Sequence, residues 1–377
     1  MNDVISTCAA YNAERLERLK EYKKKSNRKI VGFLCSQVPE ELIYAAGMLP
    51  VRIMGSREPL QMADSLLQTY VCSFSRSCLD LMLLGKYQFL DGLVVPHTCD
   101  TIRALFGVID RNVPFGFTHF LKYPISLDKP EAAVLVVEEY KEMKEKLEKF
   151  AGKKITDQDI RDAISVYNKN RELLKKLAAF RLADDRRITG KDFLEVVLAG
   201  FVMDKKDHNI LLEKLLKDLA SQKPSFSKKP RLVVAGNVLD NSGMLKIIED
   251  AGADIVWDDL CTGTRYFGSS VDEKKAPLEG LLEHYLARTY CPCKGQLQRR
   301  IDYLLDMVKA KKAQGIIMLH QKFCDPHLWD VKFVREEMEK IGIPVLEIEY
   351  EQFAGDSGSA GGIKTRVQSL IEMIGGK

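Results

Sequence analysis

The stretch Leu-Asp-Gly-Leu-Val-Val-Pro-His-Thr-Cys-Asp at residues 90–100 decides the expected fold, because Gly-Ile-Ile-Met-Leu-His-Gln-Lys-Phe-Cys-Asp at 315–325 repeats its pattern. Each stretch is a short apolar run followed by a His and then by a Cys directly before an Asp. An apolar run of this length, bounded by polar residues, is typical of a buried parallel strand. We therefore expect Cys99 and Cys324 just past the carboxyl ends of two strands, where open α/β sheets bind ligands.

Strands and helices alternate outward from both stretches, which indicates a doubly wound parallel sheet in each half of the chain. The predicted class is α/β, with two Rossmann-like parallel-sheet lobes and an intervening helical segment. The expected domains are 1–128, 129–226 and 227–377, where 129–221 holds three to four helices and 222–230 is a linker. Predicted strands are 29–34, 49–54, 90–95, 113–121, 231–235, 254–258, 315–319 and 344–348. Predicted helices are 1–28, 39–47, 72–84, 100–109, 245–251, 296–313, 331–341 and 364–374, the last after a Gly-rich turn at 355–362.

The composition excludes several classes of protein. The chain has 377 residues, 46% hydrophobic and 29% charged, with a net charge of +4 that is dispersed along the sequence. This predicts a globular protein without a nucleic-acid partner. No apolar run reaches about 18 residues, so no membrane span is expected, and no signal peptide is apparent. Nine cysteines without a secretion signal argue against a disulfide framework and favour the reducing cytoplasm.

Three remote cysteines carry the candidate chemistry. Cys72 opens the sequence Cys-Ser-Phe-Ser-Arg-Ser, where a helix N-terminus would favour its thiolate form. Together with Cys99 and Cys324 it has a spacing unlike compact zinc motifs or the bacterial ferredoxin run. Three such thiols meeting between two lobes would suit a cluster with one non-Cys ligand. The alternative is that each is a small buried hydrophobic residue.

The remaining cysteines and the histidines give weaker signals. Cys291-Pro-Cys293 is the closest pair, yet a Cys-x-Cys spacing alone is weak evidence for a site. His97 and His320 could be fourth ligands or donors to cluster sulfur, or ordinary polar residues at strand ends. The residues expected to be structural are Cys78, pointing into the core; Cys8, Cys35 and Cys261; and Asp100 and Asp325 as helix caps.

Several motifs resemble the benzoyl-CoA reductase and 2-hydroxyacyl-CoA dehydratase family. They are Cys-Ser-Phe-Ser-Arg-Ser at 72–77, His-Thr-Cys-Asp-Thr-Ile-Arg at 97–103 and Lys-Phe-Cys-Asp-Pro at 322–326, with 38–51 and 258–267 also similar. The resemblance covers essentially the whole chain and is strongest to the smaller, β-type subunits of (R)-2-hydroxyacyl-CoA dehydratases. The Gly-rich segment 355–363 and the extra cysteines Cys261, Cys291 and Cys293 depart from that pattern.

The resemblance implies a [4Fe–4S] cluster with three Cys ligands, which match Cys72, Cys99 and Cys324, and a non-Cys fourth ligand. It also implies a heterodimer with a related, larger α-type subunit. A separate homodimeric iron–sulfur ATPase would act as the activator of the enzyme, in an anaerobic metabolism. The absence of a Walker A motif in this chain agrees with that division of labour.

The implied reaction is the syn-elimination of water from an (R)-2-hydroxyacyl-CoA to an (E)-2-enoyl-CoA. It proceeds through a ketyl radical and is started by ATP-driven injection of one electron. The acyl-CoA is expected mainly on the partner subunit, so this chain would relay the electron, and no catalytic residue is assigned. Two alternatives stay open: a subunit of an ATP-dependent benzoyl-CoA-type reductase, and a non-catalytic, metal-stabilised scaffold subunit.

Overall fold

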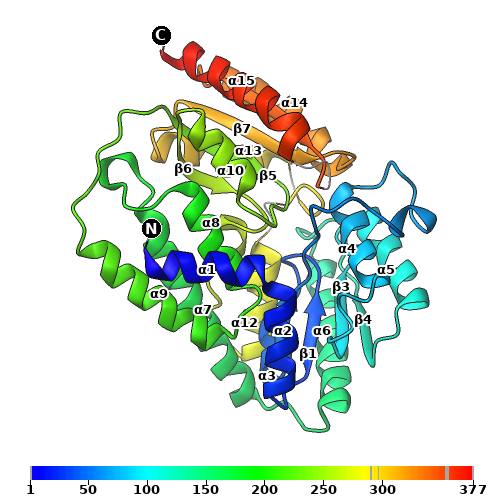
Figure 1. Ribbon diagram of the computed structural model, residues 1–377. Helices are drawn as coiled ribbons and strands as arrows, with labels where there is room; N and C mark the ends of the chain where they lie inside the picture. The colour runs from blue at the N-terminus through cyan, green and yellow to red at the C-terminus, as the bar shows by residue number, and fades with distance from the viewer. Residues whose placement is uncertain (1, 289–290, 296, 353–355, 376–377) are drawn as a thin grey trace.

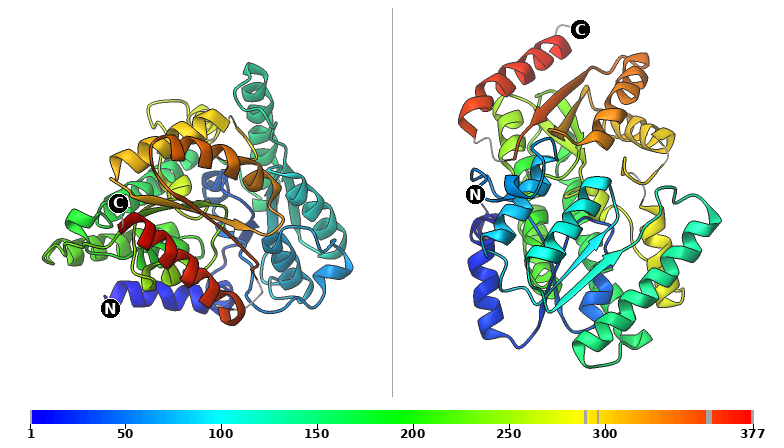
Figure 2. Two further views of the ribbon diagram at one scale, coloured as in Figure 1. Left: turned by 90° about the horizontal axis from the view of Figure 1, so that it is seen from above. Right: turned by 90° about the vertical axis from the view of Figure 1, so that its right-hand side faces the viewer.

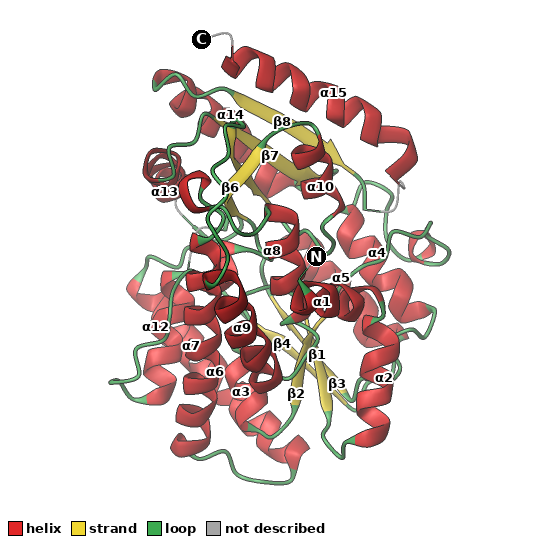
Figure 3. Cartoon of the chain, turned by 60° about the vertical axis from the view of Figure 1, so that its left-hand side comes forward, coloured by secondary structure: helices red, strands yellow, loops and turns green. Residues whose placement is uncertain are grey.

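The computed structural model describes residues 2–288, 291–295, 297–352 and 356–375 and contains two parallel sheets surrounded by helices (Figure 1). One sheet comes from the N-terminal part of the chain and the other from the C-terminal part. Figure 3 shows one sheet above the other, with a group of helices beside the lower one. The α/β class with two parallel-sheet lobes, predicted from sequence, is confirmed.

The N-terminal sheet has the strand order β2-β1-β3-β4, and every pair is parallel. Its central strands β1 and β3 are buried along their whole length, as expected for strands covered by helices on both faces. The strands are β1 (Ile30–Phe33), β2 (Leu49–Arg52), β3 (Gly92–Pro96) and β4 (Phe117–Leu121). The helices are α1 (Asp3–Ala13), α2 (Arg15–Lys25), α3 (Glu40–Ala45), α4 (Ser73–Leu83) and α5 (Asp100–Asn112), with a 3-10 turn η1 (Ala63–Ser65).

The C-terminal sheet repeats this topology in the order β6-β5-β7-β8, again entirely parallel. In both sheets the first strand of the lobe is central, the second lies on one side and the third on the other; Figure 2 shows this sheet and its helices from two further directions. The strands are β5 (Arg231–Gly236), β6 (Asp254–Asp259), β7 (Gly315–Gln321) and β8 (Val345–Tyr350). The helices are α10 (Gly243–Asp250), α11 (Thr264–Phe267), α12 (Pro277–Ala287), α13 (Leu297–Ala310), α14 (Asp325–Lys340) and α15 (Asp356–Gly375).

Four helices lie between the two sheets in sequence, within the predicted range of three to four. They are α6 (Pro130–Ala151), α7 (Asp157–Ala179), α8 (Gly190–Ala199) and α9 (Lys205–Ala220), with a 3-10 turn η2 (Ala183–Asp185). Helix α7 begins with a capping box: the Thr156 side chain accepts from the Asp159 amide, and Asp159 accepts from the Thr156 amide at 2.8 Å. This reciprocal pair satisfies two amides that the first helical turn leaves without partners.

Two buried ion pairs join this helical segment to both lobes. Arg171 on α7 pairs with Glu41 on α3 of the N-terminal lobe. Arg181, just past α7, pairs with Asp258 on β6 at 2.6 Å. One hydrophobic core accordingly runs through all three parts of the chain, from Val31 on β1 through Leu174 on α7 to Ile317 on β7.

The structure corrects some predicted boundaries. The expected helix over 1–28 is two helices that break at Glu14, because α1 packs on α8 and α9 whereas Leu19 of α2 is buried in the core of the N-terminal lobe. The predicted Gly-rich turn is helical from residue 356 onward, since Val367 and Leu370 of α15 are buried in the core, which overrides weak local propensity. Gly355 and Gln296 lie outside the described residues. The helices α11 and α12 were not predicted. Among the described helices, none is long and apolar enough to cross a membrane.

Candidate functional site: a cysteine-lined cavity between the lobes

The carboxyl ends of both sheets open onto one cavity of about 200 Å³. Cys35 follows β1 and Cys99 follows β3 in the N-terminal lobe, while Asn237 follows β5 and Cys324 follows β7 in the C-terminal lobe. The strands of each pair, β1 and β3 or β5 and β7, are the two central strands of their sheet, and the chain continues from them toward opposite edges. Such switch points are where open α/β sheets bind ligands.

The three cysteines predicted to form the site line this cavity together. Each is the residue directly before a helix: Cys72 before α4, Cys99 before α5 and Cys324 before α14. The prediction that Asp100 and Asp325 would be the helix caps is wrong by one position, because both are already helical while the preceding cysteines are not. Each thiol therefore lies at the positive end of a helix.

Burial decides the protonation state of Cys72. It raises the pKa of the Cys72 thiol to about 11, although the amides of Ser75 and Phe74 act in the opposite direction. The helix N-terminus was expected to favour the thiolate, but desolvation of Cys72 outweighs the effect of the helix end on its pKa. A metal cation would be needed to deprotonate this thiol.

The other two predicted thiols differ from each other. A hydrogen bond from Cys293 lowers the pKa of the Cys99 thiol, helped by the amides of Ile102 and Thr101. For Cys324, burial raises the pKa of the thiol, while the Asn237 side chain opposes the shift.

Four further cysteines line the same cavity: Cys35, Cys261, Cys291 and Cys293. Cys35 and Cys261, which were expected to be structural, are partly exposed in the cavity. Their signal was present in the sequence, because each follows a predicted strand in the same way as Cys99. Cys291 and Cys293 come from the loop between α12 and α13, whose position no local pattern reveals.

Cys8 and Cys78 are the two cysteines that lie in the hydrophobic core, and both are fully buried, as predicted. The histidines of the repeated pattern do not line the cavity. The His97 ring lies 5.9 Å from that of Phe120, and His320 Nε2 is buried 3.3 Å from a carboxylate oxygen of Glu347. His327, in the first turn of α14, lines the cavity instead.

Two cavity segments have strained backbone. Cys35 has φ 67° and Phe323, directly before Cys324, has φ 64°; both are in the left-handed region that only glycine adopts readily. A non-glycine residue in that region costs about 1–3 kcal/mol and persists only where the surroundings impose it. The surrounding structure therefore determines the position of thiols from both lobes.

The cavity fits a polyatomic group better than a single ion. Among the described residues, no three Cys, His, Asp or Glu side chains are grouped closely enough to hold one metal ion. A volume of about 200 Å³ is also several times the share of one water molecule, about 30 Å³. Partly exposed thiols spread around such a space are the donor set of an iron–sulfur cluster.

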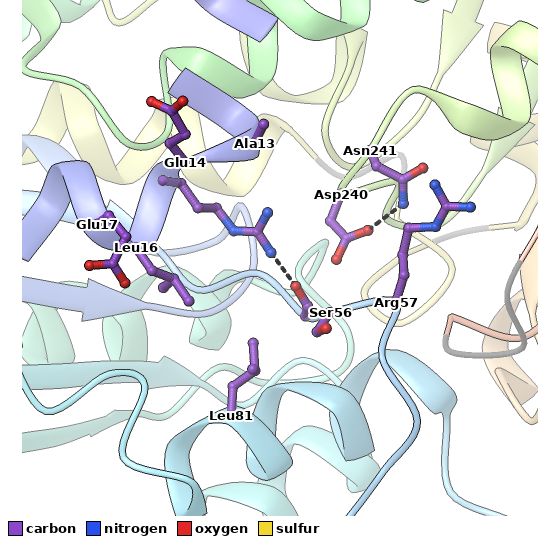
Figure 4. Close-up of a pocket in the computed structure, with 11 residues that line it drawn as sticks. Ala13, Glu14, Leu16, Glu17, Ser56, Arg57, Leu81, Asp240 and Asn241 are labelled. Carbon is purple, nitrogen blue, oxygen red and sulfur yellow. Dashed lines mark hydrogen bonds between the residues drawn. The ribbon is translucent and has the colours of Figure 1, made fainter. Parts of the chain in front are cut away.

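A different pocket, of about 340 Å³, opens where α1 meets α2 (Figure 4). Arg15, Arg57 and Asp240 are among the residues that line it, and none of its lining residues is Cys or His. Arg15 donates to the Gly55 carbonyl, and Asn241 donates to Asp240 at 3.0 Å. The thiol-lined cavity is therefore the candidate functional site.

Fold and site together define a two-lobed α/β protein with a cysteine-lined cavity between its parallel sheets. The chain belongs to the family described as HGD-D, 2-hydroxyglutaryl-CoA dehydratase, D-component, whose model matches residues 35–374. The family resemblance seen in the motifs is thereby confirmed.

Curated relatives match almost the whole chain. The (R)-phenyllactyl-CoA dehydratase beta subunit of Clostridium sporogenes is 28% identical, covering 99% of this chain and 97% of its own length. A benzoyl-CoA reductase subunit of Thauera aromatica is 28% identical, with 94% of each covered. The (R)-2-hydroxyglutaryl-CoA dehydratase subunit beta of Acidaminococcus fermentans is 28% identical, covering 93% of this chain and 94% of its own length.

Proposed function

We propose that this chain is the iron–sulfur subunit of an (R)-2-hydroxyacyl-CoA dehydratase, in which Cys72, Cys99 and Cys324 hold a [4Fe–4S] cluster with a non-Cys fourth ligand. The observation that carries the proposal is the convergence of these three thiols, from both lobes, on one cavity. They lie 27 and 225 residues apart in sequence, so their meeting is a property of the fold. The dehydratase beta subunits among the relatives support the assignment of the subunit type.

The residues around the cavity fit such a group. The three thiols would lose their protons on ligation, and the first-turn amides of α4 and α5 would stabilise the resulting negative charge. Phe74, Ile102 and Val238 form an apolar part of the cavity wall. When bound, the cluster would supply one-electron chemistry at low potential, which burial and hydrogen bonds to sulfur tune.

The proposed partners follow from the same assignment. A larger related subunit would hold most of the acyl-CoA, and this chain would pass it the electron that starts the elimination of water. A separate ATP-hydrolysing iron–sulfur activator would deliver that electron, in agreement with the absence of a Walker A motif here. Nine unpaired cysteines are compatible with the cytoplasm as the place of action.

A second candidate is a subunit of an ATP-dependent benzoyl-CoA-type reductase. It is favoured by the match to the benzoyl-CoA reductase of Thauera aromatica, at the same 28% identity as the dehydratase subunits. Both candidates use the same three thiols and differ in the partner and the substrate.

The test is anoxic production of the chain with the subunit encoded beside it and with the activator. Iron analysis and electron paramagnetic resonance before and after ATP addition then follow the cluster. We expect iron, a cluster signal that ATP-driven reduction changes, and formation of an enoyl-CoA from an (R)-2-hydroxyacyl-CoA. A dienoyl product from an aromatic thioester would select the reductase. A colourless protein with stoichiometric zinc would overturn both candidates in favour of a scaffold.

A further inference from the structure

The cavity holds more thiols than one cluster can use. A [4Fe–4S] cluster takes at most four cysteine ligands, whereas seven cysteines line this cavity. Even if a fourth cysteine completes the site of Cys72, Cys99 and Cys324, three of the seven thiols are left without a role in that cluster. Cys35, Cys261 and Cys291 are partly exposed like the first three, unlike the buried Cys8 and Cys78.

The thiols fall into two groups with one residue between them. Cys35 directly precedes Ser36, whose Oγ donates to the Cys261 carbonyl at 2.8 Å, so Cys35 and Cys261 are neighbours, and Cys291 lines the same cavity. Cys72, Cys99 and Cys324 each stand directly before a helix, whereas Cys35, Cys261 and Cys291 lie in loops. The Cys293 side chain interacts with that of Cys99 in one group and with that of Cys291 in the other.

Main-chain contacts hold the second group in place. The Cys261 carbonyl accepts from Ser36 Oγ at 2.8 Å and from Arg52 Nη1 at 3.1 Å, and its amide donates to the Asn237 carbonyl at 3.1 Å. The Cys291 carbonyl accepts from Arg300 Nη1 at 3.3 Å. The positions of these thiols are therefore fixed by groups from both lobes.

Two of the buried cations near these thiols lack anionic partners, whereas Arg265, whose Nη1 lies 3.7 Å from Cys261 Sγ, pairs with Asp259 at 2.6 Å. Arg52 is 3% exposed and Lys294 is 0% exposed, and among the described residues neither forms an ion pair with a carboxylate. Arg52 Nε has no hydrogen-bond acceptor within the described part of the chain, and Lys294 Nζ donates to the carbonyls of Tyr123 at 3.2 Å and Pro124 at 3.0 Å. A buried charge without a counter-charge is costly. Thiolates bound to metal would supply the missing negative charge.

We propose that Cys35, Cys261 and Cys291 hold a second iron–sulfur cluster in the same cavity, beside the one assigned to Cys72, Cys99 and Cys324, with Cys293 at the junction. Each of the three thiols gives up its proton to solvent as its sulfur binds iron, and the sulfide and iron come from cluster assembly. Arg52 and Lys294 balance the added negative charge. This inference rests on the proposed function for the first cluster and adds a second polynuclear site to it.

Iron and acid-labile sulfide in the full chain, produced anoxically, test the proposal. Two clusters predict about eight iron atoms per chain, against about four for one. Cys35→Ser, Cys261→Ser and Cys291→Ser should each lose about half of the iron, and Cys72→Ser, Cys99→Ser and Cys324→Ser should lose the other half. Cys8→Ala, in the core, is the matched control and should keep all of it. Far-UV circular dichroism verifies that each variant is folded.

A second measurement needs no variant. Under anoxic conditions, alkylation followed by mass spectrometry should find Cys35, Cys261 and Cys291 protected in the iron-loaded chain and reactive after chelation. Alkylation of these three thiols in the loaded chain would overturn the second cluster.

The iron counts separate this proposal from the function it rests on. About four irons, lost with Cys72→Ser but kept with Cys35→Ser, would refute the second cluster and leave the proposed function intact. About four irons that depend only on Cys35, Cys261 and Cys291, or no iron at all, would refute both.

Discussion

The hydroxyl of Ser36 donates a hydrogen bond to the carbonyl oxygen of Cys261, 2.8 Å away. Ser36 lies just past β1 of the N-terminal sheet, and Cys261 lies just past β6 of the C-terminal sheet. This contact joins the carboxyl ends of the two sheets directly beside the cavity. Arg52, at the end of β2, donates to both of these atoms and extends the junction. The relative position of the two lobes thus determines the shape of the thiol site.

Replacing Arg52 by Met should make the cluster harder to reduce. Reduction adds negative charge, which the buried guanidinium stabilises, so its loss should lower the midpoint potential. The expected change is roughly 1–2 kcal/mol, or about 40–90 mV for one electron. A redox titration followed by electron paramagnetic resonance measures it.

The matched control for that substitution is Arg186→Met. Arg186 is also an arginine that is largely shielded from solvent, but it pairs with Asp254 at 3.0 Å, at the amino end of β6 and away from the cavity. Its replacement should leave the potential unchanged. Equal shifts in the two variants would contradict a specific role of Arg52.

Replacing Arg181 by Met should destabilise the protein strongly. Arg181 and Asp258 form a buried pair at 2.6 Å that joins the helical segment to β6. Removing one partner leaves a buried charge uncompensated, at a cost of about 3–5 kcal/mol in the free energy of unfolding. Urea unfolding measures this cost. The double variant Arg181→Met/Asp258→Asn should recover part of the loss, and a double variant less stable than both single ones would argue against this cause.

The buried His208 should make the protein less stable in mild acid. Its Nδ1 accepts from Asn170 at 2.9 Å and its Nε2 donates to the Val196 carbonyl at 3.0 Å, so a second ring proton would face a donor. Burial lowers the pKa of His208 to about 3. Between pH 6.5 and 3 the unfolded chain therefore binds a proton that the folded chain does not, and stability falls as the pH falls.

At pH 5 this linkage corresponds to about 2 kcal/mol relative to neutral pH. His208→Gln cannot titrate, so its free energy of unfolding should change by about that much less between pH 7 and pH 5. Urea unfolding at the two pH values makes the comparison. The same pH dependence in both proteins would assign the acid sensitivity to other groups.

Replacing Gly236 by Ala should disrupt the site by displacing the backbone at the end of β5. Gly236 ends β5 directly before Asn237, and a Cβ there would lie 1.9 Å from the Leu319 carbonyl oxygen on β7. Because the obstacle is backbone of a neighbouring strand, the two central strands must separate. We expect a lower melting temperature and reduced iron content.

Gly107→Ala is the control for this substitution. Gly107 lies within α5, and a Cβ there meets nothing within 4 Å. Its replacement should stabilise the protein by about 0.5–1 kcal/mol through helix propensity. A similar melting temperature for the two variants would contradict the steric argument.

The local pattern of the sequence was enough to predict the strands and most helices. Apolar runs such as that before His97 specify buried strands because burial on both faces requires them to be continuous. The helices α11 and α12 escaped prediction, and α15 begins within a Gly-rich segment whose propensity disfavours a helix. In these places packing against the rest of the protein, which no local window contains, determines the structure.

The sequence by itself determined that Cys99 and Cys324 follow the strands β3 and β7, because the period and length of an apolar run are local properties. It also carried the family resemblance that the motif around Cys72 suggested. Only the tertiary structure decided that Cys35, Cys261, Cys291 and Cys293 share their cavity and that His97 and His320 do not. The reason is that the neighbours of a thiol at the ends of two sheets depend on how the two lobes pack. Burial and neighbouring charge, not residue type, then determine the protonation state of that thiol.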